Sequence, residues 1–200
     1  MKKLLAIILI TLSLIACGGG GSDSEESVKV VSNTPVHVIV MGDSITAQSG
    51  MRVRDHLQKA KPGSTMENLG YNARRAKEML EGTYGSLPVL NKNFFYVVSF
   101  GTNEYLQGRS VEEYIKSIED ILIYFKGYNV ILEAPWLVVN KGCSCNNIND
   151  FRDQLKILGA KYNVPVLLEN SLENTDTIHL TGPHMDERAA LIAKTILEKY

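Results

Sequence analysis

A chain of 200 residues corresponds to one domain of ordinary size. Its 44% hydrophobic and 22% charged residues exclude collagen-like, coiled-coil and disordered proteins as descriptions of the whole chain. The 21 basic and 22 acidic residues give a formal charge of −1, which excludes a broad basic surface for nucleic acid. Three cysteines and 8% aromatic residues exclude a disulfide scaffold and an aromatic-rich binding surface.

The first 16 residues have the pattern of an export signal. Two lysines precede an apolar run over residues 4–15, which is too short to span a bilayer comfortably as a permanent helix. The run ends in Leu-Ile-Ala-Cys at Cys17, which resembles the bacterial lipobox. In that motif the signal is cut just before a cysteine that then carries lipid. The alternative is a plain secretory signal in which Cys17 stands by chance.

The resemblance to bacterial lipoproteins implies a diacylglyceryl group on Cys17 and an acyl group on its amine. Two or more such chains anchor a protein stably. Residues 17–34 begin with four glycines after Cys17 and predict a flexible tether. No later stretch is apolar for long enough to cross a membrane, so we expect a protein anchored in the bacterial cell envelope. The residue after Cys17 is Gly18. Resemblance to enteric lipoproteins links an Asp at this position to retention in the inner membrane, so the absence of Asp favours the outer membrane.

From residue 35 to residue 200, short apolar strands alternate with amphipathic helices. Strands are predicted over residues 36–41, 64–69, 94–100, 129–134 and 164–168. Helices are predicted over 46–60, 72–81, 111–125, 151–162 and 189–197. Ser110 and Glu113 have the spacing of a capping box before the third helix. This alternation predicts an α/β fold with a five-stranded, mainly parallel sheet covered on both faces.

Polar motifs stand at the points where several predicted strands end, and sites in parallel sheets gather at the carboxyl ends of strands. In chain order they are Gly42-Asp43-Ser44, Asn68-Leu69-Gly70, Gly101-Thr102-Asn103-Glu104 and Asp176-Thr177-Ile178-His179. A serine hydroxyl is a poor nucleophile until a base takes its proton. Asp176 can hold one ring nitrogen of His179 while the other faces such a hydroxyl. Taken singly, each motif also fits a helix cap or an ordinary turn.

The four motifs, in this order, resemble the SGNH (GDSL-type) hydrolase family over residues 36–200. The resemblance implies a flavodoxin-like three-layer α/β/α sandwich and serine ester hydrolysis without a metal or organic cofactor. Carried over, Ser44 is the nucleophile, His179 is the general base and then the acid, and Asp176 orients His179. Asn103 and the Ser44 backbone N–H are implied donors to the oxyanion.

A third oxyanion donor is less clear from the motif. The family pattern Asn-x-Gly-x-x-Gly has Ala73 at its last position here, so the donor is either Ala73 or Gly70. Alanine still offers a backbone N–H, but only if the local dihedral angles suit a residue with a Cβ atom. Losing one donor typically costs about 10²–10³ in rate.

The leading hypothesis is therefore a lipid-anchored serine esterase of the cell envelope that cleaves short-chain, including O-acetyl, esters. Its expected partners are a small ester or acylated glycan and, through Cys17, the membrane. One alternative is an O-acetyltransferase that passes the acyl group to a sugar hydroxyl. Another is a surface binding lipoprotein of this fold with little catalytic power, a reading that only Ala73 favours.

Several other side chains have both a functional and an ordinary interpretation. Cys143 and Cys145 are interpreted as surface-loop thiols or a loop staple, because a metal site needs more ligands nearby. Arg74 and Arg75 could meet an anionic substrate or be solvated. Trp136 could form a pocket wall or sugar platform, or serve packing alone.

Overall fold

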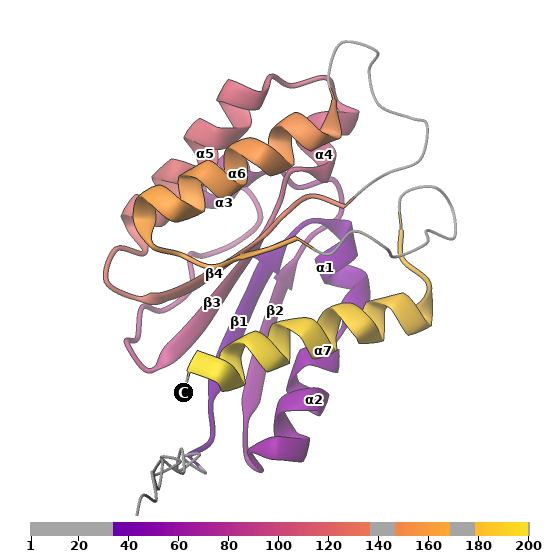
Figure 1. Cartoon of the computed structure of the whole chain (residues 1–200), viewed down its shortest axis with the longest axis vertical. Helices are drawn as coiled ribbons and strands as arrows, with labels where there is room; N and C mark the ends of the chain where they lie inside the picture. The colour runs from indigo at the N-terminus through magenta and orange to yellow at the C-terminus, as the bar shows by residue number, and fades with distance from the viewer. Residues whose placement is uncertain (1–33, 137–146, 169–178, 200) are drawn as a thin grey trace, which may run out of the picture. The chain divides into compact units, whose positions relative to one another are not determined.

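A single parallel sheet forms the centre of the protein (Figure 1). The computed structural model describes residues 34–136, 147–168 and 179–199, all within the unit Val31–Tyr200. The strands are β1 (His37–Gly42), β2 (Thr65–Gly70), β3 (Phe94–Ser99), β4 (Asn129–Glu133) and β5 (Val166–Leu167). Their order is β2-β1-β3-β4-β5, and each neighbouring pair is parallel, which confirms the predicted five-stranded sheet.

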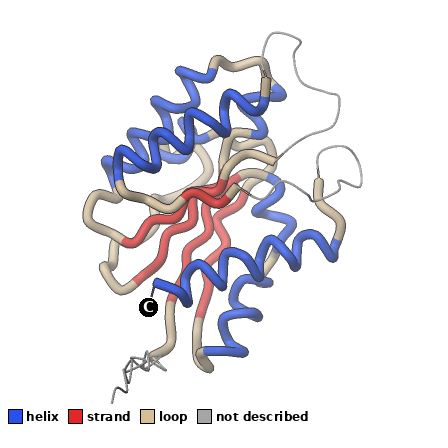
Figure 2. The backbone as a smooth tube through the Cα atoms, viewed as in Figure 1, coloured by secondary structure: helices blue, strands red, loops and turns tan. Residues whose placement is uncertain are grey.

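Helices cover both faces of this sheet (Figure 2). One layer contains α2 (Arg52–Ala60) and α7 (Gly182–Lys199), and the other contains α3 (Ala76–Leu80), α5 (Val111–Tyr124) and α6 (Ile148–Tyr162). Two short helices, α1 (Ser44–Ser49) and α4 (Thr102–Leu106), follow β1 and β3 directly. The three-layer α/β/α arrangement and its flavodoxin-like strand order are confirmed.

Successive strand residues supply the two apolar cores, because side chains alternate between the faces of a sheet. In β1, Val38 and Val40 pack with α2 and α7, whereas Ile39 and Met41 pack toward α3, α5 and α6. The α5 side holds the aromatic rings of Tyr96, Phe100, Tyr114, Phe125 and Phe151. Burying such a side chain stabilises the fold by about 1.5–3 kcal/mol. The packed sheet therefore fixes the positions at which the loops at its ends begin.

Two predicted helices are shorter or divided in the structure. The helix predicted over 46–60 is wrong as one element, because Gly50 (φ 58°, ψ −133°) separates α1 from α2. The helix predicted over 72–81 begins only at Ala76, because Ala73 has a φ of 59° in the left-handed region. Both interruptions lie beside the carboxyl ends of β1 and β2.

The remaining differences concern the ends of elements. Residues 102–106 form α4, a helix that is not predicted from the sequence, and α7 begins at Gly182 rather than at residue 189. Ser110 caps α5 as predicted, its Oγ accepting the Glu113 N–H at 3.1 Å. Among the helices of the described ranges, none has the length and apolar character needed to cross a membrane. The predicted signal, the predicted lipidation site Cys17 and the predicted tether through residue 33 lie outside the described residues, as do Cys143, Cys145 and Asp176.

Candidate active site

The turn between β1 and α1 places Ser44 at the carboxyl edge of the sheet. Gly42 has no room for a side chain, since a Cβ atom there would lie 2.5 Å from the Ser99 carbonyl oxygen. The next residue, Asp43, is the N-cap of α1, and its Oδ1 accepts the Ile45 N–H at 2.9 Å. The capping role therefore belongs to Asp43, which leaves the hydroxyl of half-buried Ser44 available for chemistry.

The imidazole of His179 lies against this hydroxyl. His179 Nε2 is 3.0 Å from Ser44 Oγ, although the two residues are 135 positions apart. The segment that carries His179 is held by its neighbour Leu180, which is buried with Ile45, Trp136 and Met185. A heavy-atom separation of this size allows direct proton transfer between serine and histidine.

Both side chains open into a cavity of about 250 Å³. Its lining consists of Ser44, Gln48, Asn72, Ala73, Asn103, Leu106 and His179. The lining contains no Asp, Glu, Lys or Arg side chain, so beside the imidazole of His179 the cavity offers amide and hydroxyl groups. Gln48, Asn72 and Leu106 are not among the residues predicted from the sequence. The sequence signal for their place in the cavity lining is only that each lies within a few positions of Ser44, Ala73 or Asn103.

Two N–H groups of residues that line the cavity are candidate donors to an oxyanion. Asn103 Nδ2 donates one hydrogen to the Arg74 carbonyl oxygen at 3.0 Å, and its second hydrogen remains for the cavity. This bond also decides which end of the Asn103 amide carries the nitrogen. Ser44 is the first residue of α1, so its backbone N–H has no acceptor within the helix.

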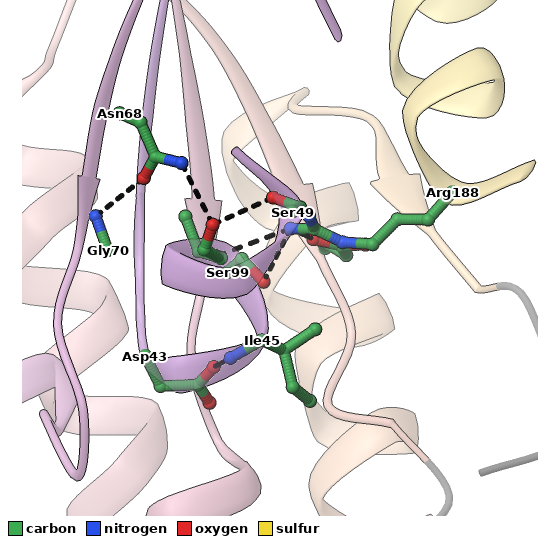
Figure 3. A network of polar contacts seen from close by, with 9 residues as sticks. Asp43, Ile45, Ser49, Asn68, Gly70, Ser99 and Arg188 are labelled. Carbon is green, nitrogen blue, oxygen red and sulfur yellow. Dashed lines mark hydrogen bonds and ion pairs between the residues drawn. The ribbon is translucent and has the colours of Figure 1, made fainter. Parts of the chain in front are cut away.

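The structure separates the two candidates for the third donor. Ala73 lines the cavity and holds φ at 59°, a conformation that costs a residue with a Cβ atom about 1–2 kcal/mol. The Gly70 N–H instead donates to Asn68 Oδ1 at 2.9 Å (Figure 3). A Cβ atom on Gly70 would lie 2.2 Å from the Ala47 backbone nitrogen. Gly70 thus permits close packing of β2 against α1, and Ala73 is the residue at the cavity.

A buried arginine, Arg188, connects α7 to β4, α1 and β3 beneath the site through its hydrogen bonds (Figure 3). Arg188 of α7 pairs with Glu133 at the end of β4, with Nε 2.7 Å from Oε1 and Nη2 2.5 Å from Oε2. Arg188 Nη1 also donates to Ser49 Oγ at 3.0 Å, and Nη2 donates to Ser99 Oγ at 3.3 Å. Sequence reasoning missed this pair, although Arg188 stands on the apolar face of α7 beside Ala189, where a charge needs a partner.

Two further carboxyl groups lie buried close to the site. Burial raises the pKa of Asp43 to about 6, opposed by its bond from the Ile45 N–H and by the Arg188 charge. Burial also raises the pKa of Glu104 to about 7, opposed chiefly by a hydrogen bond from the Ala76 N–H, and Asp43 adds to the increase. Both groups therefore change charge between mildly acid and neutral pH.

The remaining sequence candidates lie away from the cavity lining. Arg74 is buried, donates to the Leu69 carbonyl oxygen at 3.1 Å, and stacks 5.1 Å from the ring centre of Tyr71. Arg75 pairs with Glu78 at 2.6 Å, and Trp136 packs in the small core beside α1. Over the described ranges, no three His, Cys, Asp or Glu side chains gather as a metal site would need.

Comparison by sequence gives no matching family model and no matching curated protein. Solved structures do resemble the fold. A member of the lipolytic G-D-S-L family from Veillonella parvula is 18% identical, with a TM-score of 0.65 over 80% of this chain and 98% of that one. A lipase/acylhydrolase from Enterococcus faecalis is 18% identical, with a TM-score of 0.66 over 82% and 96%. The acetylxylan esterase Axe2 from Geobacillus stearothermophilus is 14% identical, with a TM-score of 0.64 over 82% and 94%. At these identities the likeness establishes the fold.

Proposed function

We propose that this protein is a serine esterase of the SGNH type, with Ser44 as nucleophile and His179 as general base. The observation that carries the proposal is the 3.0 Å separation of Ser44 Oγ and His179 Nε2 at the edge of the cavity. His179 takes the Ser44 proton as Oγ attacks the ester carbonyl carbon, and then gives that proton to the leaving alcohol. Water, deprotonated by His179, attacks the acyl-enzyme and releases the carboxylic acid.

Three N–H groups stabilise the oxyanion in this proposal. They are the Ser44 backbone N–H, the second hydrogen of Asn103 Nδ2 and the Ala73 backbone N–H. The left-handed conformation of Ala73 supports the third assignment, because the structure keeps this strained backbone at the cavity wall. Gly70 is not proposed, since its N–H is already used by Asn68.

Asp176 is the proposed partner of His179, and this part rests on the sequence alone. The spacing Asp-x-x-His puts a carboxylate within one turn of the imidazole. Such a carboxylate holds the ring in one tautomer and stabilises the imidazolium that forms during the reaction. Replacing Asp176 with Asn would then lower kcat and leave the fold intact.

The cavity favours a small neutral ester as substrate. Its volume of about 250 Å³ fits a short acyl group, and its amides from Gln48 and Asn72 can bond hydroxyl groups of the alcohol portion. The fold is shared with proteins described as a lipase/acylhydrolase and as an acetylxylan esterase. We therefore favour removal of O-acetyl groups from a glycan.

We further propose that the protein acts in the bacterial cell envelope, anchored by lipid on Cys17. The lipobox-like sequence before Cys17 and the glycine run after it support this location. The test is incorporation of a labelled fatty acid by cells that express the full chain. The wild type should be labelled and should partition with membranes, whereas Cys17→Ser should do neither. Labelling of both proteins would contradict the anchor.

The activity is tested with nitrophenyl esters of increasing acyl length. We expect the wild type to prefer acetate and butyrate, and Ser44→Ala to lose roughly 10⁴-fold or more in kcat. Ser117→Ala is the matched control, because Ser117 Oγ donates to the Glu113 carbonyl oxygen in an exposed hydrogen bond on α5, away from the cavity lining. Equal rates for the wild type and Ser44→Ala would contradict the serine mechanism. An acetylated glycan assayed with an added acceptor sugar distinguishes hydrolysis from transfer.

A further inference from the structure

We propose that Glu104 is a positioning residue for the oxyanion site, because its carboxylate connects the two chain segments that supply Asn103 and Ala73. The inference rests on the proposed esterase function. It assigns a task to a side chain that touches neither the cavity nor the nucleophile–base pair. Glu104 is 3% exposed and follows Asn103 directly on α4.

The two oxygens of this carboxyl group bond to different segments. Oε2 accepts the N–H of Gly101 at 3.1 Å, within the turn that leads from β3 into α4. Oε1 accepts the N–H of Ala76 at 2.6 Å, 28 positions earlier in the chain and three residues after Ala73. The first bond is an ordinary helix cap. The second bond crosses to α3 and is not needed to cap α4.

A second cross-connection lies one residue away on α4 and two residues away on the segment that precedes α3. Asn103 Nδ2 donates to the Arg74 carbonyl oxygen at 3.0 Å. The pair of bonds therefore holds the segment of residues 73–76 to residues 103–104 at two adjacent points. Ala73 lies at one end of this junction in a strained conformation, and such conformations persist only where the surroundings hold them.

The charges around Glu104 make the junction sensitive to pH. Asp43 raises the pKa of Glu104, and burial brings it to about 7. The buried Tyr114 interacts electrostatically with both carboxyl groups and with Arg152, and the Arg75 charge also acts on Glu104. An ionised carboxylate accepts both N–H bonds fully, whereas the protonated form weakens one of them. The junction should thus tighten as Glu104 loses its proton.

The test compares two variants that break the junction from opposite sides. Glu104→Gln keeps the size of the side chain but presents an NH₂ group to one of the two N–H donors. Ala76→Pro removes the Ala76 N–H and leaves Glu104 unchanged. The backbone at this position suits proline, because Ala76 is the first residue of α3 and the preceding Arg75 (φ −105°, ψ 162°) already has the extended conformation that a following proline requires. Ala76 is fully buried, so circular dichroism is used to check that the variant folds.

Glu78→Gln is the matched control. Glu78 also accepts a backbone N–H at the start of α3, that of Arg75 at 2.8 Å, but it does not reach α4. For both junction variants we expect kcat to fall by about 10²-fold on nitrophenyl acetate, as for the loss of an oxyanion donor, with KM changed less than threefold. Affinity for a trifluoromethyl ketone, which forms an oxyanion on Ser44, should fall in parallel. Glu78→Gln should keep the wild-type kcat.

The pH profile separates positioning from a purely structural role. Because His179 must be unprotonated to act as the base, kcat should rise with pH in both proteins. The wild type should show an additional step near pH 7 that is missing in Glu104→Gln. If Glu104→Gln does not fold, Ala76→Pro decides the matter alone. The inference would be overturned if the junction variants that fold keep the wild-type kcat and the wild-type affinity for the ketone, provided that Ser44→Ala is inactive. An active Ser44→Ala would instead overturn the proposed function on which the inference rests.

Discussion

The two ends of the central sheet each carry a cavity, and the larger of these two is not the candidate active site. At the amino ends of the strands, a cavity of about 330 Å³ is lined by residues such as Phe125, Tyr128 and Lys199. At the carboxyl ends, the cavity of about 250 Å³ holds Ser44 and His179. The chemistry of the lining, rather than the volume of the cavity, therefore distinguishes the candidate site.

The direction of the strands explains this difference. At the carboxyl ends, each strand leads into the beginning of a helix, where backbone N–H groups lack partners within the helix. At the amino ends, helices finish, and their last carbonyl groups are the ones left over. One end of the sheet can therefore stabilise a developing anion, whereas the other mainly accepts hydrogen bonds.

The largest effect that tests this comparison comes from two asparagines at opposite ends of the sheet. Asn103→Ala should lower kcat on nitrophenyl acetate by about 10²–10³-fold, because an oxyanion donor is lost. Asn129 donates its amide to the carbonyl oxygens of Lys92 and Phe94 at the amino end. Asn129→Ala should cost about 1 kcal/mol of stability and leave kcat unchanged. Equal losses of kcat in both variants would remove the distinction between the ends.

The second prediction concerns stability beneath the site. Arg188→Met should lower the free energy of unfolding by about 3–5 kcal/mol in urea titrations, because it leaves the Glu133 carboxylate buried without its partner. Arg188→Met combined with Glu133→Leu should recover most of that loss. Lys161→Met, which breaks the exposed pair with Glu119, should have a much smaller effect. A mild effect of Arg188→Met alone would show that water reaches the buried pair.

The third prediction is a fall in stability as the pH rises from about 5 to 8. The pKa of Asp43 is raised from 3.8 to about 6 in the folded protein, and the pKa of Glu104 is raised from 4.5 to about 7. Each folded group holds its proton more tightly than the unfolded chain does. Its contribution is therefore fully present below the unfolded pKa and is lost as the pH passes the folded one.

Urea titrations across this range measure the slope, which reaches at most about 1.4 kcal/mol per pH unit for each group. Asp43→Asn and Glu104→Gln should each flatten the curve between pH 5 and 8. Glu78→Gln serves as a control, because the pKa of Glu78 is lowered and its contribution changes only in more acid solution. Stability that rises across the window would contradict the buried state of both carboxyl groups.

The smallest expected effect is that of Ala73→Gly. Glycine adopts the φ of 59° without strain but loses more conformational entropy on folding, so the net change in stability should stay within about 1 kcal/mol. The backbone N–H remains, and kcat should therefore stay within about threefold of the wild type. A loss comparable to that of Asn103→Ala would indicate that the alanine methyl group contacts the substrate.

The sequence by itself determined the elements of this protein and the motifs at their ends. Short continuous apolar runs and apolar residues at a period of 3.6 are local patterns, so the five strands and most helices could be predicted from them. The motifs containing Ser44, Asn103 and His179 also follow directly from the chain. Their neighbours in space do not, because the distance between Ser44 and His179 depends on how 135 residues fold between them.

Only the tertiary structure decided the details that shape the site. The break at Gly50, the assignment of Ala73 rather than Gly70 to the cavity, and the burial of Glu104 and Arg188 all depend on contacts between distant segments. The intrinsic helix or strand propensity of a glycine, an alanine or a charged residue is the same whether or not a distant segment of the chain contacts it in the folded protein. Close packing and the cost of burying a charge then fix its conformation, and these act only once the layers have come together.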